Sequence, residues 1–299
     1  MREFTVTQND SGQRLDKFIT KLMPKLPKSM LYKGLRKNCV RVNGKHKKDG
    51  SEFVSCGDVV TLYFADEFFE KENTFRYAKK NFGVVYEDEN ILVVDKPVGV
   101  LSHADENGSK DTLIDMVKSY LYDKGEYLPE SEQTFKPALC NRLDRNTGGL
   151  VIAAKNAEAL REVNKSIKMR RLRKFYLAIV TGEPEASGHL EDKLLREEKV
   201  TKVSDDGKVA SLDYKVLSRE NGLNLVEVEL HTGRTHQIRT QFASIGCPLL
   251  GDTKYGGVGA KFRQALYAVR LVAEFDNDSC MAYLNGKEFK IKAPFESEF

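Results

Sequence analysis

The sequence contains little cysteine, and the spacing of its cysteines excludes two common classes of protein. No two of them form a C-x-x-C pair, and their number is odd. Such a scattered set predicts neither a disulfide framework nor a zinc knuckle. We therefore expect reduced and mostly packed thiols at all five positions, which are Cys39, Cys56, Cys140, Cys247 and Cys280.

Long apolar runs are also missing. No stretch approaches the roughly 18 consecutive apolar residues that a membrane helix requires, and the N-terminal MREFTVTQND lacks the basic and apolar regions of a secretory signal. Hydrophobic residues make up 40% and charged residues 31% of the 299 positions, as in a soluble globular protein. We expect a cytoplasmic protein without membrane contact, large enough for one large and one small domain.

Acidic residues are absent from one long stretch near the N-terminus. Residues 17–48 hold eleven Lys or Arg and no Asp or Glu. Residues 1–65 carry 13 basic and 6 acidic side chains, a net charge of +7, whereas the whole chain carries only +4. Such an excess of positive charge attracts phosphates and is the usual sign of nucleic-acid binding. The alternative is a solvated helix face, although such faces usually interleave acids with their Lys and Arg.

Helix and strand patterns divide this basic region into a small module. Apolar residues at helical spacing predict a helix over 15–23, and Ser29 is a suitable N-cap for a second short helix. The segment VRVNGK predicts a strand that enters a turn at Asn43-Gly44, and GDVVTLYF predicts another strand. This order resembles the small RNA-binding module first known from a ribosomal protein of the small subunit. We therefore assign residues 1–65 to such a module.

A charged, irregular segment over 66–80 is the best linker candidate, which leaves residues 81–299 as a second domain. Strand and helix patterns alternate in this domain. The predicted elements are a hairpin over 84–97, a helix over 111–121, a buried strand over 150–154, a helix from Asn156, and strands at 176–182, 212–218, 223–230 and 271–275. The whole chain is therefore predicted to have an α+β fold.

Polar residues and a glycine pair lead directly into a buried strand in the stretch CNRLDRNTGGLVIAAKN. A loop at the end of a strand would hold these side chains over a cleft, and the glycines at 148–149 would allow close approach of the backbone. Asp144 is the residue that this loop would present for chemistry. From the residues alone, it is an equal alternative that Asp144 only pairs with Arg142 or Arg145 or caps a turn. The same tripeptide Arg-Leu-Asp occurs at 14–16, where it only opens a helix.

Two other stretches carry side chains that could complete a site. HTGRTHQIRTQFASIG predicts a turn and then a helix whose apolar residues Ile238, Phe242 and Ile245 point inward, with the final glycine ending the helix. Arg239 is then free to reach a carboxylate. In RKFYLAIV, Tyr176 stands at the start of a strand, where an aromatic ring can form the wall of a cleft, although a lone aromatic residue there is more often part of the core.

Four segments, in this order, resemble the RluA family of pseudouridine synthases. They are DKPVGVLSH, NRLDRNTGGLVIAAKN, RKFYLAIVTGEP and TGRTHQIRTQFASIGCPLLGDTKYG. The resemblance covers nearly the whole chain, since that family often carries the same small RNA-binding module in front. It implies a mixed, mainly antiparallel catalytic sheet with a central cleft, and an isomerase that converts uridines of structured RNA to pseudouridine.

Pseudouridine formation breaks the bond from ribose to the uracil ring nitrogen, rotates the base and rejoins ribose to a ring carbon. Nothing is oxidised, so no cofactor and no metal is expected, and the sequence has neither a convincing phosphate-binding glycine loop nor a metal-ligand motif. The habit of the family favours large-subunit ribosomal RNA as the substrate, with tRNA as the alternative. A monomer is expected, with a dimer left open.

The resemblance also implies roles at matching positions. Asp144 corresponds to the catalytic aspartate, Tyr176 to the tyrosine beside the base that is flipped out of the RNA, and Arg142 to the arginine that enters the nucleic acid. The aspartate would pair with Arg239 rather than Arg234, which would lie near a substrate phosphate. The full set of predicted substrate-binding residues is Arg142, Arg234, Thr147, Lys33, Arg36, Lys37 and Arg41.

Two positions depart from the pattern of the family. Asn141 stands where His is usual, and Gly148 where Ser is frequent. An asparagine keeps hydrogen-bonding capacity but does not titrate near neutral pH. This supports an alternative, a catalytically inactive RNA-binding or ribosome-assembly factor, although Asp144, Tyr176 and Arg239 are intact. A carboxylate-based glycosidase would need a second catalytic acid and would not explain the basic module.

Overall fold

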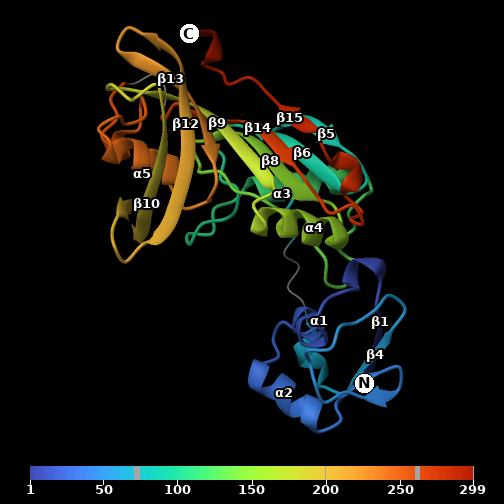
Figure 1. Ribbon diagram of the computed structural model, residues 1–299. Helices are drawn as coiled ribbons and strands as arrows, with labels where there is room; N and C mark the ends of the chain where they lie inside the picture. The colour runs from blue at the N-terminus through green and yellow to red at the C-terminus, as the bar shows by residue number, and fades with distance from the viewer. Residues whose placement is uncertain (71–74, 199, 260–262, 299) are drawn as a thin grey trace. The chain divides into compact units, whose positions relative to one another are not determined.

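The computed structural model describes residues 1–70, 75–198, 200–259 and 263–298, and the chain divides into two compact units (Figure 1). The first unit comprises Met1–Tyr77, Lys118–Pro137 and Asn156–Glu158, and the second comprises Ala78–Val117, Ala138–Lys155 and Ala159–Phe299. Part of the predicted linker, residues 71–74, lies outside the described residues. The boundaries placed at residues 65 and 81 remain predictions.

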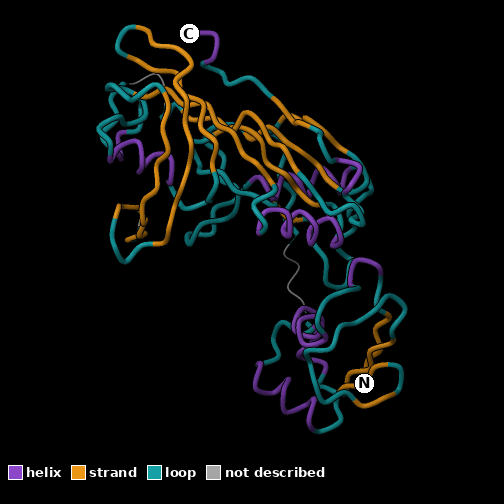
Figure 2. The backbone as a smooth tube through the Cα atoms, in the orientation of Figure 1, coloured by secondary structure: helices purple, strands orange, loops and turns teal. Residues whose placement is uncertain are grey.

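Two helices and a four-stranded sheet form the body of the first unit (Figure 2). Apolar side chains of both helices, among them Phe18, Ile19 and Leu35, are fully buried in one core with the sheet. The predicted first helix and the predicted strands are confirmed, whereas β1 was not predicted. The elements are β1 (Arg2–Thr5), η1 (Gln8–Asp10), α1 (Leu15–Leu22), α2 (Lys28–Arg36), β2 (Val40–Val42), β3 (Lys45–His46), β4 (Val59–Leu62) and η2 (Asp66–Phe69), with strand order β1-β4-β2-β3.

A few residues explain where α2 begins and where the chain turns after β2. The prediction of Ser29 as N-cap is wrong, because α2 begins at Lys28 and Pro27 holds the cap position with φ −61°. The proline ring fixes φ near this value, so the chain enters the helix there without a side-chain cap. The predicted turn at Asn43-Gly44 is confirmed: both residues have positive φ, 52° and 75°, as a type I′ hairpin turn requires.

A segment from the middle of the sequence, residues 118–137, completes the first unit. The hydroxyl groups of Thr134 and Thr7 donate hydrogen bonds to the carboxylate of Asp10, which is fully buried. Gln13 Nε2 donates in turn to Thr134 Oγ1 at 2.9 Å. A buried carboxylate is costly unless it is hydrogen-bonded, so these contacts stabilise the attachment of this segment.

An eleven-stranded mixed sheet is the framework of the second unit (Figures 1 and 2). The strand order is β11-β10-β12-β13-β9-β14-β8-β6-β5, with β15 beside β14 and β7 beside β8. Every pairing among the described strands is antiparallel except that of β14 with β8. The bounds are β5 (Gly83–Glu87), β6 (Ile91–Lys96), β7 (Ala138–Leu139), β8 (Gly148–Ala154), β9 (Leu172–Val180), β10 (Ser187–Glu197), β11 (Val200–Val203), β12 (Lys208–Glu220), β13 (Leu223–Leu230), β14 (Leu266–Ala273) and β15 (Glu288–Lys290).

Helices cover parts of this sheet. Ala159 and Val163 of α4 are buried in one cluster with residues of β6, β8 and β14. Phe242 of α5 packs edge-on against Tyr214 of β12, with ring centroids 5.2 Å apart. The α+β class and the mixed, mainly antiparallel sheet are thus confirmed. The helices are α3 (Leu113–Asp123), α4 (Ala157–Lys168) and α5 (Gln237–Ser244), with short 3₁₀ helices η3 (Thr253–Tyr255), η4 (Ala282–Leu284) and η5 (Glu296–Glu298).

The glycine pair at the start of β8 permits the close approach of β14 that was expected. Gly149 has φ 113°, and a Cβ there would lie 2.3 Å from the carbonyl oxygen of Ala268. A Cβ on Gly148 would lie 2.2 Å from a ring carbon of Tyr267. The serine that is frequent in the RluA family at this position therefore does not fit while Tyr267 occupies its present place.

Two local predictions for the second unit differ from the structure, and strands β7, β10, β11 and β15 were not predicted. Tyr176 lies in the middle of β9 rather than at its start. Ile245 does not point inward: α5 ends at Ser244, Gly246 turns the chain with φ 75°, and Ile245 is 41% exposed.

Two expectations from the composition can be compared directly with the structure. The five cysteines are free thiols, of which Cys247 is buried and Cys56 exposed. Within the described residues, no helix combines the length and the apolar character that crossing a membrane would require.

Candidate active site

The loop between β7 and β8 presents Asp144, and hydrogen bonds to a second loop hold it in place. Ser102 Oγ donates to the Leu143 carbonyl at 2.8 Å and accepts from the Leu143 N–H at 3.1 Å. The Gly99 N–H donates to the Arg145 carbonyl at 2.8 Å. Residues on both sides of Asp144 are therefore fixed to the loop that follows β6, which contains the DKPVGVLSH segment.

Lys96 lies beneath this loop and is fully buried. Its Nζ donates to the carbonyl oxygens of Pro97, Val100 and Arg145, at 3.0, 2.7 and 3.3 Å. Burial lowers the pKa of Lys96 to about 8, although the charges of Asp144 and Asp95 act in the opposite direction. A buried ammonium group that donates to three carbonyls joins the two loops. Lys96 was not identified in the sequence as a site residue.

Arg239 of α5 joins two carboxylates. Its Nη1 lies 3.0 Å from Asp144 Oδ2, while Nε and Nη2 donate to the two oxygens of Asp252 at 2.6 and 2.9 Å. Arg239 is 6% and Asp252 1% exposed. Burial disfavours the charged guanidinium, but the hydrogen bonds and charges of Asp252 and Asp144 outweigh it and raise the pKa of Arg239. The bidentate contact with Asp252 fixes the plane of the guanidinium.

The other arginines lie elsewhere. Arg234 is exposed, and its Nε donates to the Val209 carbonyl at 3.0 Å. Arg142 is exposed, and Arg145 lies 3.9 Å from Asp105. The alternative that Asp144 pairs with a neighbour in its own loop therefore gives way to an ion pair with Arg239, which is 95 residues away in sequence.

A histidine approaches the Asp144 oxygen that Arg239 contacts, and a tyrosine holds this histidine. His236 has a left-handed backbone, φ 54° and ψ 22°, and its Nε2 lies 3.8 Å from Asp144 Oδ2. Its Nδ1 is 2.7 Å from the hydroxyl of Tyr255, which also accepts a hydrogen bond from the Thr201 N–H at 2.9 Å. Because the Tyr255 hydroxyl accepts from Thr201, it can donate its own proton to His236 Nδ1. The imidazole proton of His236 then lies on Nε2, which faces the Asp144 carboxylate.

The protonation of His236 agrees with this arrangement. Burial lowers the pKa of His236 to about 4, against an opposing effect of Asp144. The imidazole is therefore neutral at physiological pH and can donate from Nε2 without adding a charge. The HQIR segment was read in the sequence for its arginine, and neither His236 nor Tyr255 was among the predicted catalytic or substrate-binding residues.

Tyr176 is buried in β9, opposite Val228 of β13 and Ala268 of β14. Burial raises the pKa of its phenol, and the charge of Asp144 raises it further. The phenol is therefore neutral, and it lies close enough to Asp144 for the carboxylate charge to act on it.

Two positions that were singled out in the sequence have structural contacts. The Asn141 amide bridges the backbone of β8, donating to the Leu150 carbonyl at 3.2 Å and accepting from the Ile152 N–H at 2.8 Å. Thr147 is buried, and its hydroxyl accepts from Gln264 Nε2 at 2.6 Å. The assignment of Thr147 to substrate contact is therefore corrected: a buried, hydrogen-bonded hydroxyl supports the loop from inside.

Of the predicted basic residues of the first unit, Lys33 and Arg36 lie on α2, Lys37 follows it directly, and Arg41 lies in β2. Lys33, Arg36 and Lys37 are exposed. The Arg41 guanidinium lies over the ring of Tyr63, with Cζ 5.5 Å from the ring centroid. These positions are compatible with contacts to phosphates.

The second Arg-Leu-Asp tripeptide has a different environment. Asp16 is buried in the first turn of α1, where it accepts from Arg14 Nη2 at 2.7 Å and from the Tyr32 hydroxyl at 3.1 Å. Its partners are thus one local arginine and one tyrosine. Asp144, by contrast, is 28% exposed in its side chain and can meet a substrate.

Comparison with known proteins identifies relatives of both units. Residues 90–244 match the family described as RNA pseudouridylate synthase, and residues 13–60 match the S4 domain. An uncharacterized RNA pseudouridine synthase of Mycoplasma capricolum is 32% identical over 293 residues, 96% of each chain. Ribosomal large subunit pseudouridine synthase C of Rickettsia bellii is 32% identical over 306 residues, again 96% of each chain. The structure of human RNA pseudouridylate synthase domain containing 1 has a TM-score of 0.57 at 24% identity, covering 72% of this chain and 84% of that one, and so shares the fold.

Proposed function

The chain belongs to the RNA pseudouridylate synthase family and is thus an isomerase that converts RNA uridine to pseudouridine, and from this premise we propose that its substrate is large-subunit ribosomal RNA. The name of the Rickettsia bellii relative supports this substrate, as does the S4 domain with its surplus of basic residues. Because ribosomal RNA is the proposed substrate, the proposed place of action is the cytoplasm.

We infer that Asp144 is the catalytic residue. The observation that carries this inference is the ion pair between Asp144 and Arg239, which Asp252 holds in one orientation. Addition of a carboxylate to ribose and removal of a ribose proton both require the ionised form. A fixed guanidinium at 3.0 Å orients the carboxylate and supplies its counter-charge.

Other residues would act on the base. In this proposal the exposed Arg142 enters the RNA stack and occupies the place of the flipped uridine, which offsets part of an unstacking cost of a few kcal/mol. Tyr176 would contact the uracil beside Asp144, where base–aromatic stacking contributes about 1–3 kcal/mol. Neutral His236 would help Arg239 to hold Asp144 Oδ2, since its Nε2 faces the same oxygen at 3.8 Å.

The non-catalytic alternative had its main support in Asn141. Since the Asn141 amide bridges two backbone groups of β8, its presence has a structural explanation that does not require loss of activity. The Asp144–Arg239 pair favours a catalytic protein over a pure RNA-binding factor.

The substrate can be tested by mapping pseudouridine in total RNA from cells with and without the gene. We expect discrete sites in large-subunit ribosomal RNA to disappear without the gene and to return when a wild-type copy is supplied. Loss of sites only in tRNA would overturn the proposed substrate while leaving the reaction intact. Loss of no site in any RNA would favour the RNA-binding factor.

Neutralising the exposed basic residues of the first unit should weaken RNA binding and its dependence on salt. The triple variant Lys33→Gln/Arg36→Gln/Lys37→Gln removes three candidate phosphate contacts. We expect the slope of log K against log salt concentration to become shallower by up to about 2, since each lost contact contributes about 0.7. Binding to a ribosomal RNA fragment over a salt series measures this slope.

A triple variant with the same change of charge in the other unit is the control. Lys208, Lys215 and Lys292 are exposed, and their replacement by Gln should change the slope less. If both triple variants shift the slope equally, the first unit is not a preferred docking site for phosphates.

A further inference from the structure

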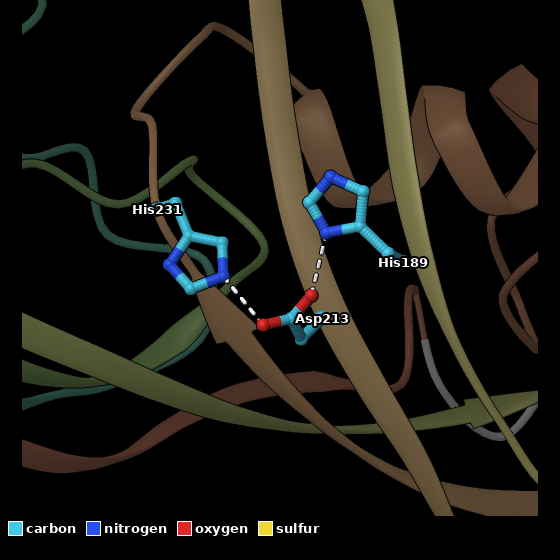
Figure 3. A group of neighbouring side chains, drawn as sticks. All are labelled: His189, Asp213 and His231. Carbon is cyan, nitrogen blue, oxygen red and sulfur yellow. Dashed lines mark hydrogen bonds and ion pairs between the residues drawn. The ribbon is translucent and has the colours of Figure 1, made fainter.

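Three side chains from neighbouring strands meet on one exposed surface of the second unit (Figure 3). His189 on β10 stands directly opposite Asp213 on β12 in the sheet register. Asp213 in turn stands opposite Glu229 on β13, and His231 follows two residues later, at the end of that strand. Residues two apart on a strand face the same side, so the hydrogen-bonded sheet itself brings the three side chains together.

The distances describe a compact group of ligand atoms. His189 Nδ1 lies 2.6 Å from Asp213 Oδ1, and His231 Nε2 lies 2.8 Å from Asp213 Oδ2. One ligand atom from each residue fits within a span of 4.8 Å, and the two imidazole rings stack with centroids 6.3 Å apart. In Figure 3 both imidazoles point a nitrogen at the same carboxylate.

We propose that His189, Asp213 and His231 bind a divalent transition-metal ion of the zinc class. Two imidazole nitrogens and one carboxylate oxygen are the ligands that zinc takes in three-residue sites, at about 2.0–2.2 Å, with water in the remaining position. The ion would take the place of the two protons now shared with the carboxylate. Side-chain exposures of 53% for His189 and Asp213 and 31% for His231 give solvent and metal direct access.

A neighbouring acid favours the tautomer that this site needs. For His189 to bind metal through Nδ1, its proton must move to Nε2, and Glu191 Oε2 lies 3.9 Å from that Nε2. A carboxylate beside the outer nitrogen of a metal-binding histidine is the usual support of such ligands. Glu229, also on this side of the sheet, is held by Arg173 through two hydrogen bonds at 2.7 and 2.9 Å and is not needed as a ligand.

The same chemistry argues against other ligands. A phosphate group of RNA would meet the negative charges of Asp213 and Glu191. Magnesium and calcium prefer all-oxygen sites, which two imidazoles do not provide. Because its ligands come from β10, from β12 and from the residue directly after β13, the bound ion would act as a cross-link between three strands.

Titration of the full-length protein with zinc, followed by calorimetry, tests the proposal. We expect one equivalent to bind, and the thermal midpoint of the protein to rise with zinc concentration as binding to the native state requires. Asp213→Asn and His231→Gln should each weaken binding by at least about tenfold. Cobalt titration should give a visible absorption band in wild type that Asp213→Asn lacks.

His46→Gln is the matched control, because His46 lies outside this group and its Nε2 is 2.7 Å from the Leu35 carbonyl. It should bind zinc as wild type does. Thermal midpoints without metal, compared for all variants, separate loss of the site from loss of the fold. The proposal is overturned if wild type binds no zinc, if the Asp213 and His231 variants bind as tightly as wild type, or if magnesium binds equally well.

Discussion

Asp144→Asn is expected to abolish pseudouridine formation while leaving the fold and the affinity for RNA nearly unchanged. The substitution keeps the volume and an oxygen that can still accept from Arg239 Nη1, but it removes the charge. Aspartate-to-asparagine changes at catalytic positions can cost roughly 10⁴-fold in rate, and a loss of that order is expected here. Release of tritium from 5-tritiated uridine in the RNA, under single-turnover conditions, measures the chemical step.

Asp16→Asn is the control, since it makes the same change in the other Arg-Leu-Asp tripeptide. Asp16 is buried between Arg14 and Tyr32 in the first unit, so its replacement should lower the stability of that unit. On saturating RNA the rate of the chemical step should stay at the wild-type value. Wild-type rates in Asp144→Asn, or an equal loss in both variants, would contradict the assignment of Asp144.

Arg239→Leu is expected to reduce both stability and activity strongly. It leaves the Asp252 carboxylate buried, at 1% exposure, without its guanidinium. Removal of one partner of a buried ion pair costs about 3–5 kcal/mol. For a domain of this size each kcal/mol corresponds to about 2–4 °C in thermal midpoint. Calorimetry should therefore record a fall of about 10 °C, and the activity should fall because Asp144 loses its positioned counter-charge.

The double variant Arg239→Leu/Asp252→Leu separates the two effects. Removing the stranded carboxylate should recover much of the stability, as replacement of whole buried ion pairs often does. The activity should not return, because Asp144 still lacks its partner. Recovery of activity together with stability would show that Arg239 acts only through the fold, and an unchanged thermal midpoint in Arg239→Leu would contradict the buried ion pair itself.

Elements with local causes could be predicted from the sequence. The spacing of Leu15, Ile19 and Leu22 is sufficient for α1, because one apolar face of a helix is set by residues three and four apart. The pair Asn43-Gly44 is sufficient for a hairpin turn, since these two residues tolerate positive φ. β1 and β10 were missed because their partners in the sheet, rather than their own composition, make them strands.

The residues of the candidate site also divide into those that the sequence predicted and those that it did not. Family motifs pointed to Asp144, Tyr176 and Arg239, and the structure supplies the contact between the first and the third. Asp252 was not predicted, although it makes the two shortest hydrogen bonds of Arg239. The residues next to Asp252 in the sequence do not indicate which side chain it contacts.

The sequence by itself determined that a basic RNA-binding module precedes an α+β synthase domain, and which loop carries the aspartate that we propose as catalytic. The tertiary structure decided which arginine reaches that aspartate, that His236 is neutral beside it, and that residues 118–137 belong with the N-terminal unit. It also decided that two histidines 42 residues apart share one carboxylate. The physical reason is that helical periodicity and turn chemistry act between residues a few positions apart. Burial and strand pairing, in contrast, bring together residues that are far apart in the sequence, and no local sequence pattern indicates these contacts.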